Sequence, residues 1–415
     1  MIQSGSRDWW RITLALCLGS FMVFNNLYVT QPLLPTLARD FGISELEASH
    51  SFTVSTLTMA LALLVFGPLS DVLGRKWLML GSMLGILICT LALSQAQNYA
   101  QLLALRALQG FFLGGLPAIA VAYMADEFEP TALMSAVGFY IAANSLGGIG
   151  GRVMGGWAGD AMGWNNAFIV VGGLGLVIWL TVSALLPKPS GFQPRPLRPA
   201  SMAADLWMHL KTPSLLMAFV FGGLQFFIFI NQYSYITFRL AAAPYSLTAN
   251  LLGLLFLTYL SGTLASTLSG RFTRRYGQPA CMAAGSLILI MGSLVTLFDS
   301  IWLIVTGLLI NSFGFFFAHS SASGWVSRNA QHAKASASSL YLVFYYLGAS
   351  TGGLYLHPFW QEWQWPGVVA SSIVVLLINF AITMKLKADQ SKALNEKADI
   401  GGTDRAQGAP PLSNN

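Results

Sequence analysis

Gly67-Pro68-Leu69-Ser70-Asp71-Val72-Leu73-Gly74-Arg75-Lys76 is a short charged segment between two long apolar stretches. A related decapeptide, GRFTRRYGQP at residues 270–279, follows about 200 residues later. Both copies keep two glycines seven residues apart, but Arg274 stands in the second copy where the first has Asp71. The pairing predicts an internally duplicated membrane transporter whose two halves have diverged.

The composition places the chain in a lipid bilayer. Of its 415 residues, 55% are hydrophobic and only 9% are charged, too few to cover a surface that faces water. Cys17, Cys89 and Cys281 all fall in apolar stretches and are expected to act as small hydrophobic residues. The net charge of +6 is spread over short loops, so no nucleic-acid partner is expected.

Twelve windows have the roughly 20 mostly apolar residues that a membrane-spanning helix needs. They lie near residues 12–35, 50–70, 77–95, 101–124, 133–157, 166–186, 214–238, 247–270, 279–298, 301–325, 336–357 and 366–386. The first is expected to be a retained helix and not a signal peptide. The predicted parts are a six-helix bundle (1–186), a proline-rich cytoplasmic linker (187–213), a second six-helix bundle (214–386) and a disordered cytoplasmic tail (387–415).

The basic residues indicate how the chain is oriented. With a cytoplasmic N-terminus, 18 of the 22 lysines and arginines fall on the cytoplasmic side, and only Arg39 and Arg239 fall outside. Arg106 and Arg152 lie within spans. The positive-inside rule therefore predicts that both termini are cytoplasmic.

The duplication extends beyond the decapeptides. The motif at residues 135–151 recurs at 336–352, and Gly110-Phe111-Phe112 recurs at Gly314-Phe315-Phe316. Internal repeats of this kind are typical of transporters in which two halves enclose a site near the membrane midplane and rock around it. The predicted fold is all-α, with two pseudo-symmetric six-helix bundles.

Polar side chains sort the spans into two groups. The third, sixth, ninth and twelfth spans are almost free of them and are expected to form the outer wall. The first, fourth, seventh and tenth are expected to line the cavity, with the candidates Asn25, Asn26, Tyr28, Gln31, Gln225, Asn231, Gln232 and Asn311, together with Tyr341 of the eleventh. The alternative is that these groups only hold helices together by hydrogen bonds.

Three motifs resemble those of the major facilitator superfamily, and more closely its twelve-helix drug:proton antiporter branch. Residues 67–76 match Gly-x-Leu-x-Asp-x-x-Gly-Arg-Lys, and residues 106–110 match Arg-x-x-Gln-Gly of the fourth helix. Residues 147–156 are similar to the antiporter motif of the fifth helix, except that Arg152 replaces its proline. The resemblance covers essentially residues 10–386.

The resemblance implies a conformational switch at Gly67, Asp71, Gly74, Arg75 and Lys76. The two glycines would allow close packing and a tight reversal. The carboxylate of Asp71 would meet the start of the eleventh helix at residues 336–339, where a helix dipole favours an anion. Arg75 would pair with Asp71, or with Asp126 and Glu127, and lock the outward-open state.

Glycines recur through the fifth span and leave a ridge without side chains. In the family this ridge meets the eighth helix, and the repeat supplies matching glycines in the eleventh. The packing candidates are Gly147, Gly151, Gly155, Gly156, Gly348 and Gly352.

An arginine inside a membrane span is energetically expensive, so Arg106 and Arg152 are candidate coupling or substrate residues. The family associates the motif of Arg106 and Gln109 with proton coupling. For Arg152, the alternatives are a structural partner such as Asp160 or a snorkelling position. His319 titrates near neutral pH and is a candidate proton relay or a packing residue. The sequence has no carboxylate deep in a span. Many related antiporters, in contrast, have an acidic residue in the cavity.

Together these features predict proton-driven export of small organic compounds through a bacterial inner membrane. The alternatives are a proton-coupled importer of a sugar or organic anion, and a membrane sensor that does not transport. The sequence has no phosphate-binding loop of an ATP-driven pump and no catalytic constellation, so an enzyme is not expected. We expect a monomer without metal or cofactor, using the proton gradient; drugs, sugars and other metabolites all remain candidate substrates.

Overall fold

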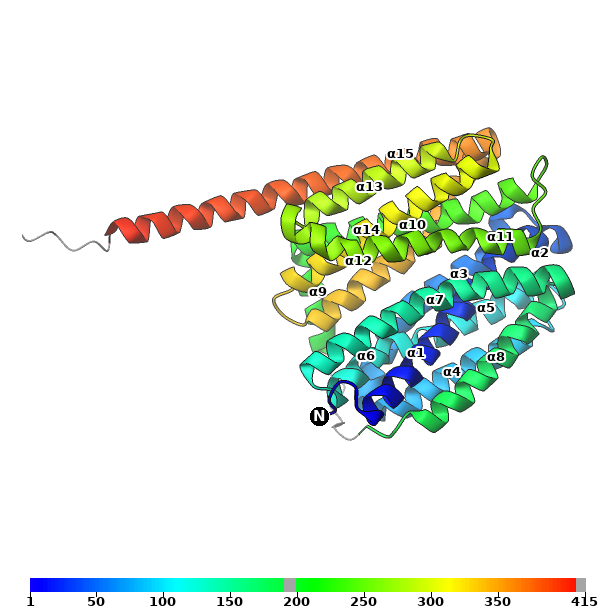
Figure 1. Ribbon diagram of the computed structural model, residues 1–415, viewed down its shortest axis with the longest axis horizontal. Helices are drawn as coiled ribbons and strands as arrows, with labels where there is room; N and C mark the ends of the chain where they lie inside the picture. The colour runs from blue at the N-terminus through cyan, green and yellow to red at the C-terminus, as the bar shows by residue number, and fades with distance from the viewer. Residues whose placement is uncertain (190–198, 408–415) are drawn as a thin grey trace, which may run out of the picture.

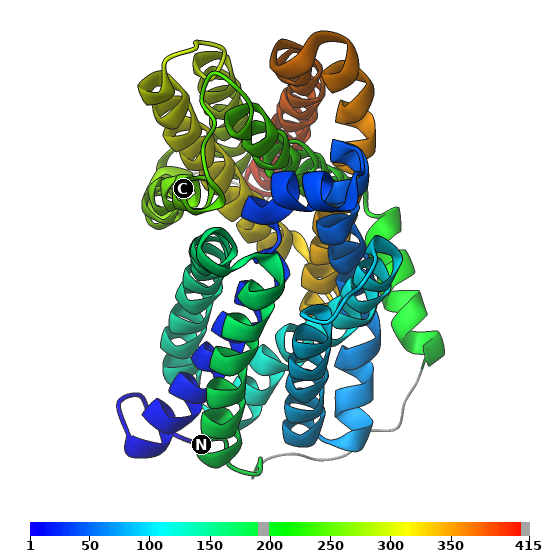
Figure 2. The same ribbon diagram turned by 90° about the vertical axis from the view of Figure 1, so that its right-hand side faces the viewer.

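The computed structural model describes residues 1–189 and 199–407, and within them every regular element is a helix. The helices form two bundles that lie side by side (Figure 1). The predicted all-α fold is therefore confirmed. Figure 2 views the molecule from the end that carries α2 and α11, with α2 lying at the boundary between the bundles.

The first bundle contains α1 (Arg7–Tyr28), η1 (Gln31–Leu33), α2 (Leu34–Phe41), α3 (Glu45–Leu73), α4 (Arg75–Leu93), α5 (Tyr99–Leu113), α6 (Gly115–Glu127), α7 (Pro130–Met162) and α8 (Trp164–Leu185). The linking helix α9 (Pro199–Lys211) precedes the second bundle. That bundle contains α10 (Pro213–Ala241), α11 (Ala249–Leu254), η2 (Leu255–Thr258), α12 (Tyr259–Tyr276), α13 (Gln278–Val295), α14 (Ile301–Asn329) and α15 (Lys334–Gln407).

Eleven helical stretches in the described residues are long and apolar enough to cross a membrane. The last of them is divided at Gln364, whose φ of 50° and ψ of −141° are not helical. It therefore supplies the predicted eleventh and twelfth spans. Beyond residue 387 the sequence predicted disorder, but α15 continues to Gln407. The alanine, lysine, glutamate and glutamine residues of this segment favour a helix. Residues 408–415 and 190–198 lie outside the described part.

The helices expected at the outer wall do expose apolar side chains. Ile88 of α4, Val177 of α8 and Met291 of α13 are each about 60% exposed. Such residues would contact lipid at no polar cost.

The glycine ridge of α7 packs mainly against α1, and at Gly156 it also meets the eighth span, as expected. A side chain at Gly147 or Gly151 would clash with the backbone of α1, and one at Gly155 with the backbone of Val29, which directly follows α1. Only Gly156 faces the second bundle, where it meets Ala249 and Gly253 of α11. The repeat is preserved, because Gly348 and Gly352 of α15 face the backbone of α10 in the same way. Most of these glycines therefore hold one bundle together, whereas Gly156 lies where the two bundles meet.

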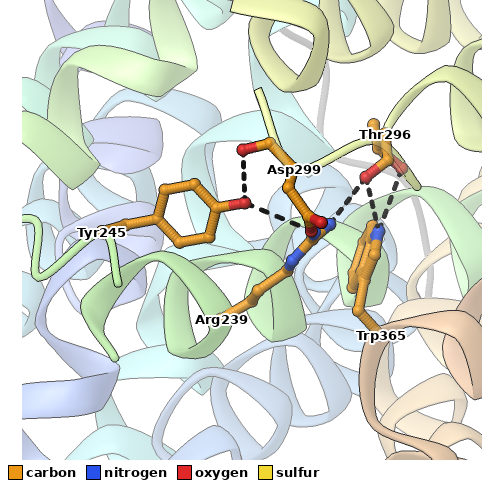
Figure 3. A network of polar contacts seen from close by, with 5 residues as sticks. All are labelled: Arg239, Tyr245, Thr296, Asp299 and Trp365. Atoms are coloured by element: carbon orange, nitrogen blue, oxygen red, sulfur yellow. Dashed lines mark hydrogen bonds and ion pairs between the residues drawn. The ribbon is translucent and has the colours of Figure 1, made fainter. Parts of the chain in front are cut away.

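A polar network ties together the loops of the second bundle at the α2 end (Figure 3). Arg239 donates to the Thr296 carbonyl at 2.6 Å and pairs with Asp299 at 3.0 Å. The Tyr245 hydroxyl donates to the Asp299 carbonyl at 2.7 Å, and the Trp365 indole donates to the Thr296 carbonyl at 3.1 Å. The end of α10, the loop after α13 and the second part of α15 are thus held in one arrangement.

The two bundles meet closely at the α2 end. The hydroxyls of Thr56 in α3 and Ser350 in α15 lie 3.1 Å apart, and Gly156 contacts Gly253 across the same boundary. The opposite end carries the N-terminus and the start of the linker, and we call it the linker end. In the described part of the chain, the side-chain hydrogen bonds and the glycine contact that join the bundles, Gln31 with Ser234, Thr56 with Ser350 and Gly156 with Gly253, all lie away from this end. The described conformation is therefore closed at the α2 end and separated at the linker end.

Candidate functional site

Arg152 of α7 lies in the boundary between the two bundles and is only 1% exposed. Its Nε donates to Gln31 Oε1 at 2.6 Å, and its Nη1 donates to the carbonyl of Gly148 at 2.9 Å. The guanidinium lies over three aromatic rings, at 3.7 Å from Tyr28, 4.5 Å from Phe256 and 4.7 Å from Tyr259. The first bundle supplies Gln31 and Tyr28, and the second supplies the other two rings.

The charge of Arg152 has no counter-ion among the described residues, since no carboxylate lies within 4.0 Å of it. Its Nη2 makes no hydrogen bond of ordinary geometry. The predicted alternatives are wrong: Asp160 is not its partner, and the side chain does not reach the surface. Burying an unpaired charge costs several kcal/mol, while a cation–π contact returns only about 0.5–2 kcal/mol. The site therefore holds a cation that is incompletely compensated.

Two broken helices meet at Arg152. The first span is interrupted between α1 and α2, where Gln31 and Pro32 belong to η1. The eighth span is interrupted by η2, which contains Phe256 and is followed directly by Tyr259. Gln31 also bridges the bundles, because its Nε2 donates to the Ser234 hydroxyl of α10 at 3.3 Å. Helix breaks at membrane depth are where transporters commonly form their binding sites.

Arg106, the second arginine within a span, is fully paired. Its Nη1 and Nη2 each donate at 2.9 Å, to the carbonyls of Asn26 and Leu27 in the last turn of α1. Its Nε donates to the Ser51 carbonyl at 2.8 Å, and Nη1 also contacts Gln109. Carbonyls in the last turn of a helix lack helical partners, and a cation there is favourable. Arg106 therefore stabilises the broken end of α1.

Most residues expected to line the cavity instead form hydrogen bonds inside one bundle. In the first bundle, Thr90 donates to Asn26 at 2.6 Å and Gln109 donates to Thr90 at 2.8 Å. The second bundle repeats this pattern, because Ser293 and Asn311 both donate to Gln232 Oε1, at 3.1 and 2.9 Å. These side chains point toward the outer helices α4 and α13. In the described conformation these side chains make the hydrogen bonds between helices that were the alternative to lining the cavity.

Three more of these candidates also bond within their own bundle. Gln225 donates to Ser286 at 2.6 Å, Asn231 to the Ala349 carbonyl at 3.0 Å and Asn25 to the Met154 sulfur at 3.5 Å. Of the polar cavity candidates in these spans, only Gln31 bonds across the boundary.

Aromatic rings cluster next to the site on both sides of the boundary. Tyr28 stacks on Phe52 with centroids 5.7 Å apart, and Phe226 stacks on Tyr345 at 3.7 Å. His319 is half-buried and accepts or donates a hydrogen bond of 2.8 Å with the Tyr341 hydroxyl. Of these groups, Tyr28 contacts Arg152 directly, and with Phe52 it gives the site a flat, largely apolar side.

The residues of the charged decapeptide lie at the linker end. Arg75 pairs with Asp71 at 3.2 Å and with Asp126 at 2.5 Å. Lys76 donates to the Leu186 carbonyl at 2.5 Å. Gly74 has a φ of 95°, which makes the tight reversal between α3 and α4 and suits glycine alone. A side chain at Gly67 would meet open space, so the expected close packing is absent there.

The pairing of Arg75 with Asp71 and Asp126 was expected to lock the outward-open state. It is nevertheless present in a conformation closed at the α2 end, the predicted outer end. All three residues belong to the first bundle, so their ion pairs do not by themselves report how the bundles are arranged. This part of the switch prediction is corrected.

Gly156 allows a test of closure at the α2 end. Gly156→Leu is expected to prevent closure, because a side chain there would strike the backbone of Ala249. Cysteines replacing Thr56 and Ser350, whose hydroxyls are 3.1 Å apart, report closure by forming a disulfide. In a background without Cys17, Cys89 and Cys281, the leucine should lower the cross-linked fraction several-fold. Gly81→Leu, which faces open space, is the matched control, and equal cross-linking in both variants would contradict the packing role.

Sequence reasoning missed Phe256, Tyr259 and Ser234 as neighbours of Arg152. Pro32 was a signal for the break in the first span, since proline interrupts a helix. The eighth span has no proline between residues 247 and 276, so the sequence did not indicate its break at η2.

Two duplicated bundles of membrane-spanning helices, in contact at one end and separated at the other, define a secondary transporter of the alternating-access kind. The model of the Major Facilitator Superfamily matches residues 16–353. The chain belongs to this superfamily, and it is not an enzyme.

Several relatives align over nearly the whole chain. The chain is 37% identical to the inner membrane transport protein YnfM of Escherichia coli, with 93% of this chain and 92% of that protein covered. It is also 37% identical to the uncharacterized MFS-type transporter YybF of Bacillus subtilis, covering 91% and 93%.

Among solved structures, a bacterial homolog of the human lysosomal transporter Spinster has a TM-score of 0.76. The match has 16% identity and covers 92% of this chain and 98% of that one. At this identity, the likeness supports the fold alone.

Proposed function

We propose that the protein is a proton-coupled antiporter of the drug and metabolite exporter type, which moves small organic compounds out of the cell by alternating access. The observation that carries the proposal is the contact of the two bundles at one end only. Between them lies Arg152, which is buried and has no counter-ion in the described part of the chain. Rocking about this position would expose it to each side in turn.

The proposed location is a bacterial inner membrane with both termini in the cytoplasm. The distribution of basic residues supports this orientation, and the relative YnfM is named an inner membrane transport protein. In that orientation the linker end faces the cytoplasm. The described conformation would then be ready to accept a substrate from inside the cell, as an exporter requires.

The proposed coupling groups differ in position. Arg152 lies at the boundary of the bundles, whereas Arg106 and Gln109 bond inside the first bundle and His319 bonds to Tyr341 inside the second. An arginine stays charged, so it would act through its charge and not carry the proton itself. His319 and the carboxylates Asp71 and Asp126 at the linker end are the candidates that can exchange a proton.

Flux in membrane vesicles tests direction and coupling. A panel of drugs, sugars and organic acids should accumulate in everted vesicles when an inward proton gradient is imposed, and a protonophore should abolish the accumulation. Accumulation in right-side-out vesicles under an inward gradient would instead establish import. If ligands bind but none moves in either orientation, the protein is a sensor and the transport proposal fails.

A further inference from the structure

We propose that Arg152 binds the negatively charged group of a flat organic anion, at the junction of the two broken helices. The chemical class is an aromatic carboxylate or a compound of similar shape and charge. This inference names the substrate class of the proposed transporter and rests on that function.

The first argument is the difference between the two buried arginines. Every nitrogen of the Arg106 guanidinium donates to a carbonyl oxygen, so Arg106 needs no ligand. Arg152 is buried to the same degree, but its Nη2 makes no hydrogen bond of ordinary geometry and no carboxylate lies within 4.0 Å of it in the described residues. Such an arginine lacks one hydrogen-bond acceptor and a negative charge. An external anion is the simplest group that supplies both.

The second argument concerns what the neighbours can offer to such an anion. The Tyr259 hydroxyl is also buried and finds no hydrogen-bond partner among the residues that the structure describes, and its ring lies 4.7 Å from the guanidinium. Nη2 and this hydroxyl are two donors that one carboxylate can accept from. Inorganic anions would satisfy the same two donors. The preference for a ligand with an aromatic ring must therefore come from other residues of the site.

The third argument is that aromatic rings surround the charge. Tyr28, Phe256 and Tyr259 all contact the guanidinium, and Phe52 extends the flat surface beyond Tyr28. Aromatic faces bind flat apolar bodies well, and a few placed polar groups fix their orientation. A ligand with one anionic group on a flat body therefore matches the site better than a sugar or a cation does.

The position also connects binding to the movement of the bundles. Phe256 and Tyr259 belong to the second bundle and Arg152 to the first, so these ring contacts break when the α2 end opens. A bound anion that accepts from both Arg152 and Tyr259 would link the two bundles. Its binding should therefore shift the population toward contact at the α2 end.

The experiment uses the purified full-length protein in detergent and measures its melting temperature. The probes are benzoate, cinnamate and 1-naphthoate, with acetate as an anion without a ring, benzamide as a neutral analogue and benzylammonium as a cation. The variants are Arg152→Gln and Arg152→Lys. Arg39→Gln is the control, because Arg39 is an exposed arginine of α2 that, within the described residues, forms an ion pair only with the neighbouring Asp40.

At least one aromatic carboxylate should raise the melting temperature of the wild type and of Arg39→Gln, with acetate, benzamide and benzylammonium giving smaller shifts. Arg152→Gln should bind that carboxylate at least about tenfold more weakly, the loss of one or two charge-assisted hydrogen bonds. Arg152→Lys should retain part of the affinity. Size-exclusion chromatography checks that each variant is folded.

Two results overturn the proposal: no aromatic carboxylate binds to the folded wild type, or binding is unchanged in folded Arg152→Gln. Vesicle flux separates this failure from failure of transport. Gradient-driven export of neutral or cationic compounds that is insensitive to Arg152→Gln rejects the anion site but keeps the exporter. Carboxylate binding that depends on Arg152, without flux in either vesicle orientation, keeps the site and rejects transport.

Discussion

Arg106→Ala is expected to cause the largest loss of stability of any single substitution in the first bundle. The change leaves the carbonyls of Asn26, Leu27 and Ser51 without the donors that they have in the structure. Each buried unsatisfied group costs about 1–3 kcal/mol, which is large against a total stability of about 5–15 kcal/mol. The variant should show a strongly reduced melting temperature and little monodisperse protein in fluorescence-detected chromatography.

Two comparisons make this expectation specific. Arg106→Lys should fold better than the alanine variant but below wild type, since an ammonium cannot reproduce the planar fork of donors. Arg39→Ala, at an exposed position, should melt like the wild type. A wild-type melting temperature for Arg106→Ala would contradict the structural role. In the folded lysine variant, flux that no longer follows the pH gradient would support the coupling role that the family resemblance implies.

Asp71→Asn is expected to abolish transport, with flux at least about tenfold below wild type, while the protein still inserts and folds. The side chain of Asp71 is 44% exposed, and exposed ion pairs contribute only about 0–1 kcal/mol to stability. Arg75 also keeps its second partner, Asp126. The lost element is the negative charge proposed to meet the start of the eleventh span, at residues 336–339, when the linker end closes.

The matched control for this prediction is Asp299→Asn. Asp299 is likewise an exposed carboxylate paired with one arginine, but it lies at the α2 end, where the second bundle alone supplies its partners. Membrane content and melting temperature should be near wild type in both variants. Unchanged flux in Asp71→Asn would remove Asp71 from the switch.

The arrangement of the spans was predictable because it depends on composition. Lipid allows few polar groups, so about 20 apolar residues mark each helix, and Ile88 and Val177 on the lipid-facing side follow from that rule. The turn at Gly74 was equally readable, since its positive φ suits glycine. The part of helix α15 beyond residue 387 was not predicted. Its polar composition was interpreted as a sign of disorder, although many of its residues favour a helix.

The site was only partly predictable, because the type of a residue does not determine which way its side chain points. Asn26 and Gln109 were expected in the cavity, but both join a network with Thr90 of an outer helix. A polar residue in a span must be satisfied, and either a neighbouring helix or a ligand can do this. Arg106 and Arg152 looked alike for the same reason. Only their neighbours distinguish a paired arginine from an unpaired one.

The sequence by itself determined that the chain spans a membrane twelve times in two related halves, because hydrophobic length and internal repeats are properties of the chain alone. The charged decapeptide also marked the place of the turn between the second and third spans. The tertiary structure decided that Arg152 is an unpaired cation where two broken helices meet. That property depends on atoms supplied by residues 28, 31, 256 and 259, which are brought together only when the two bundles pack.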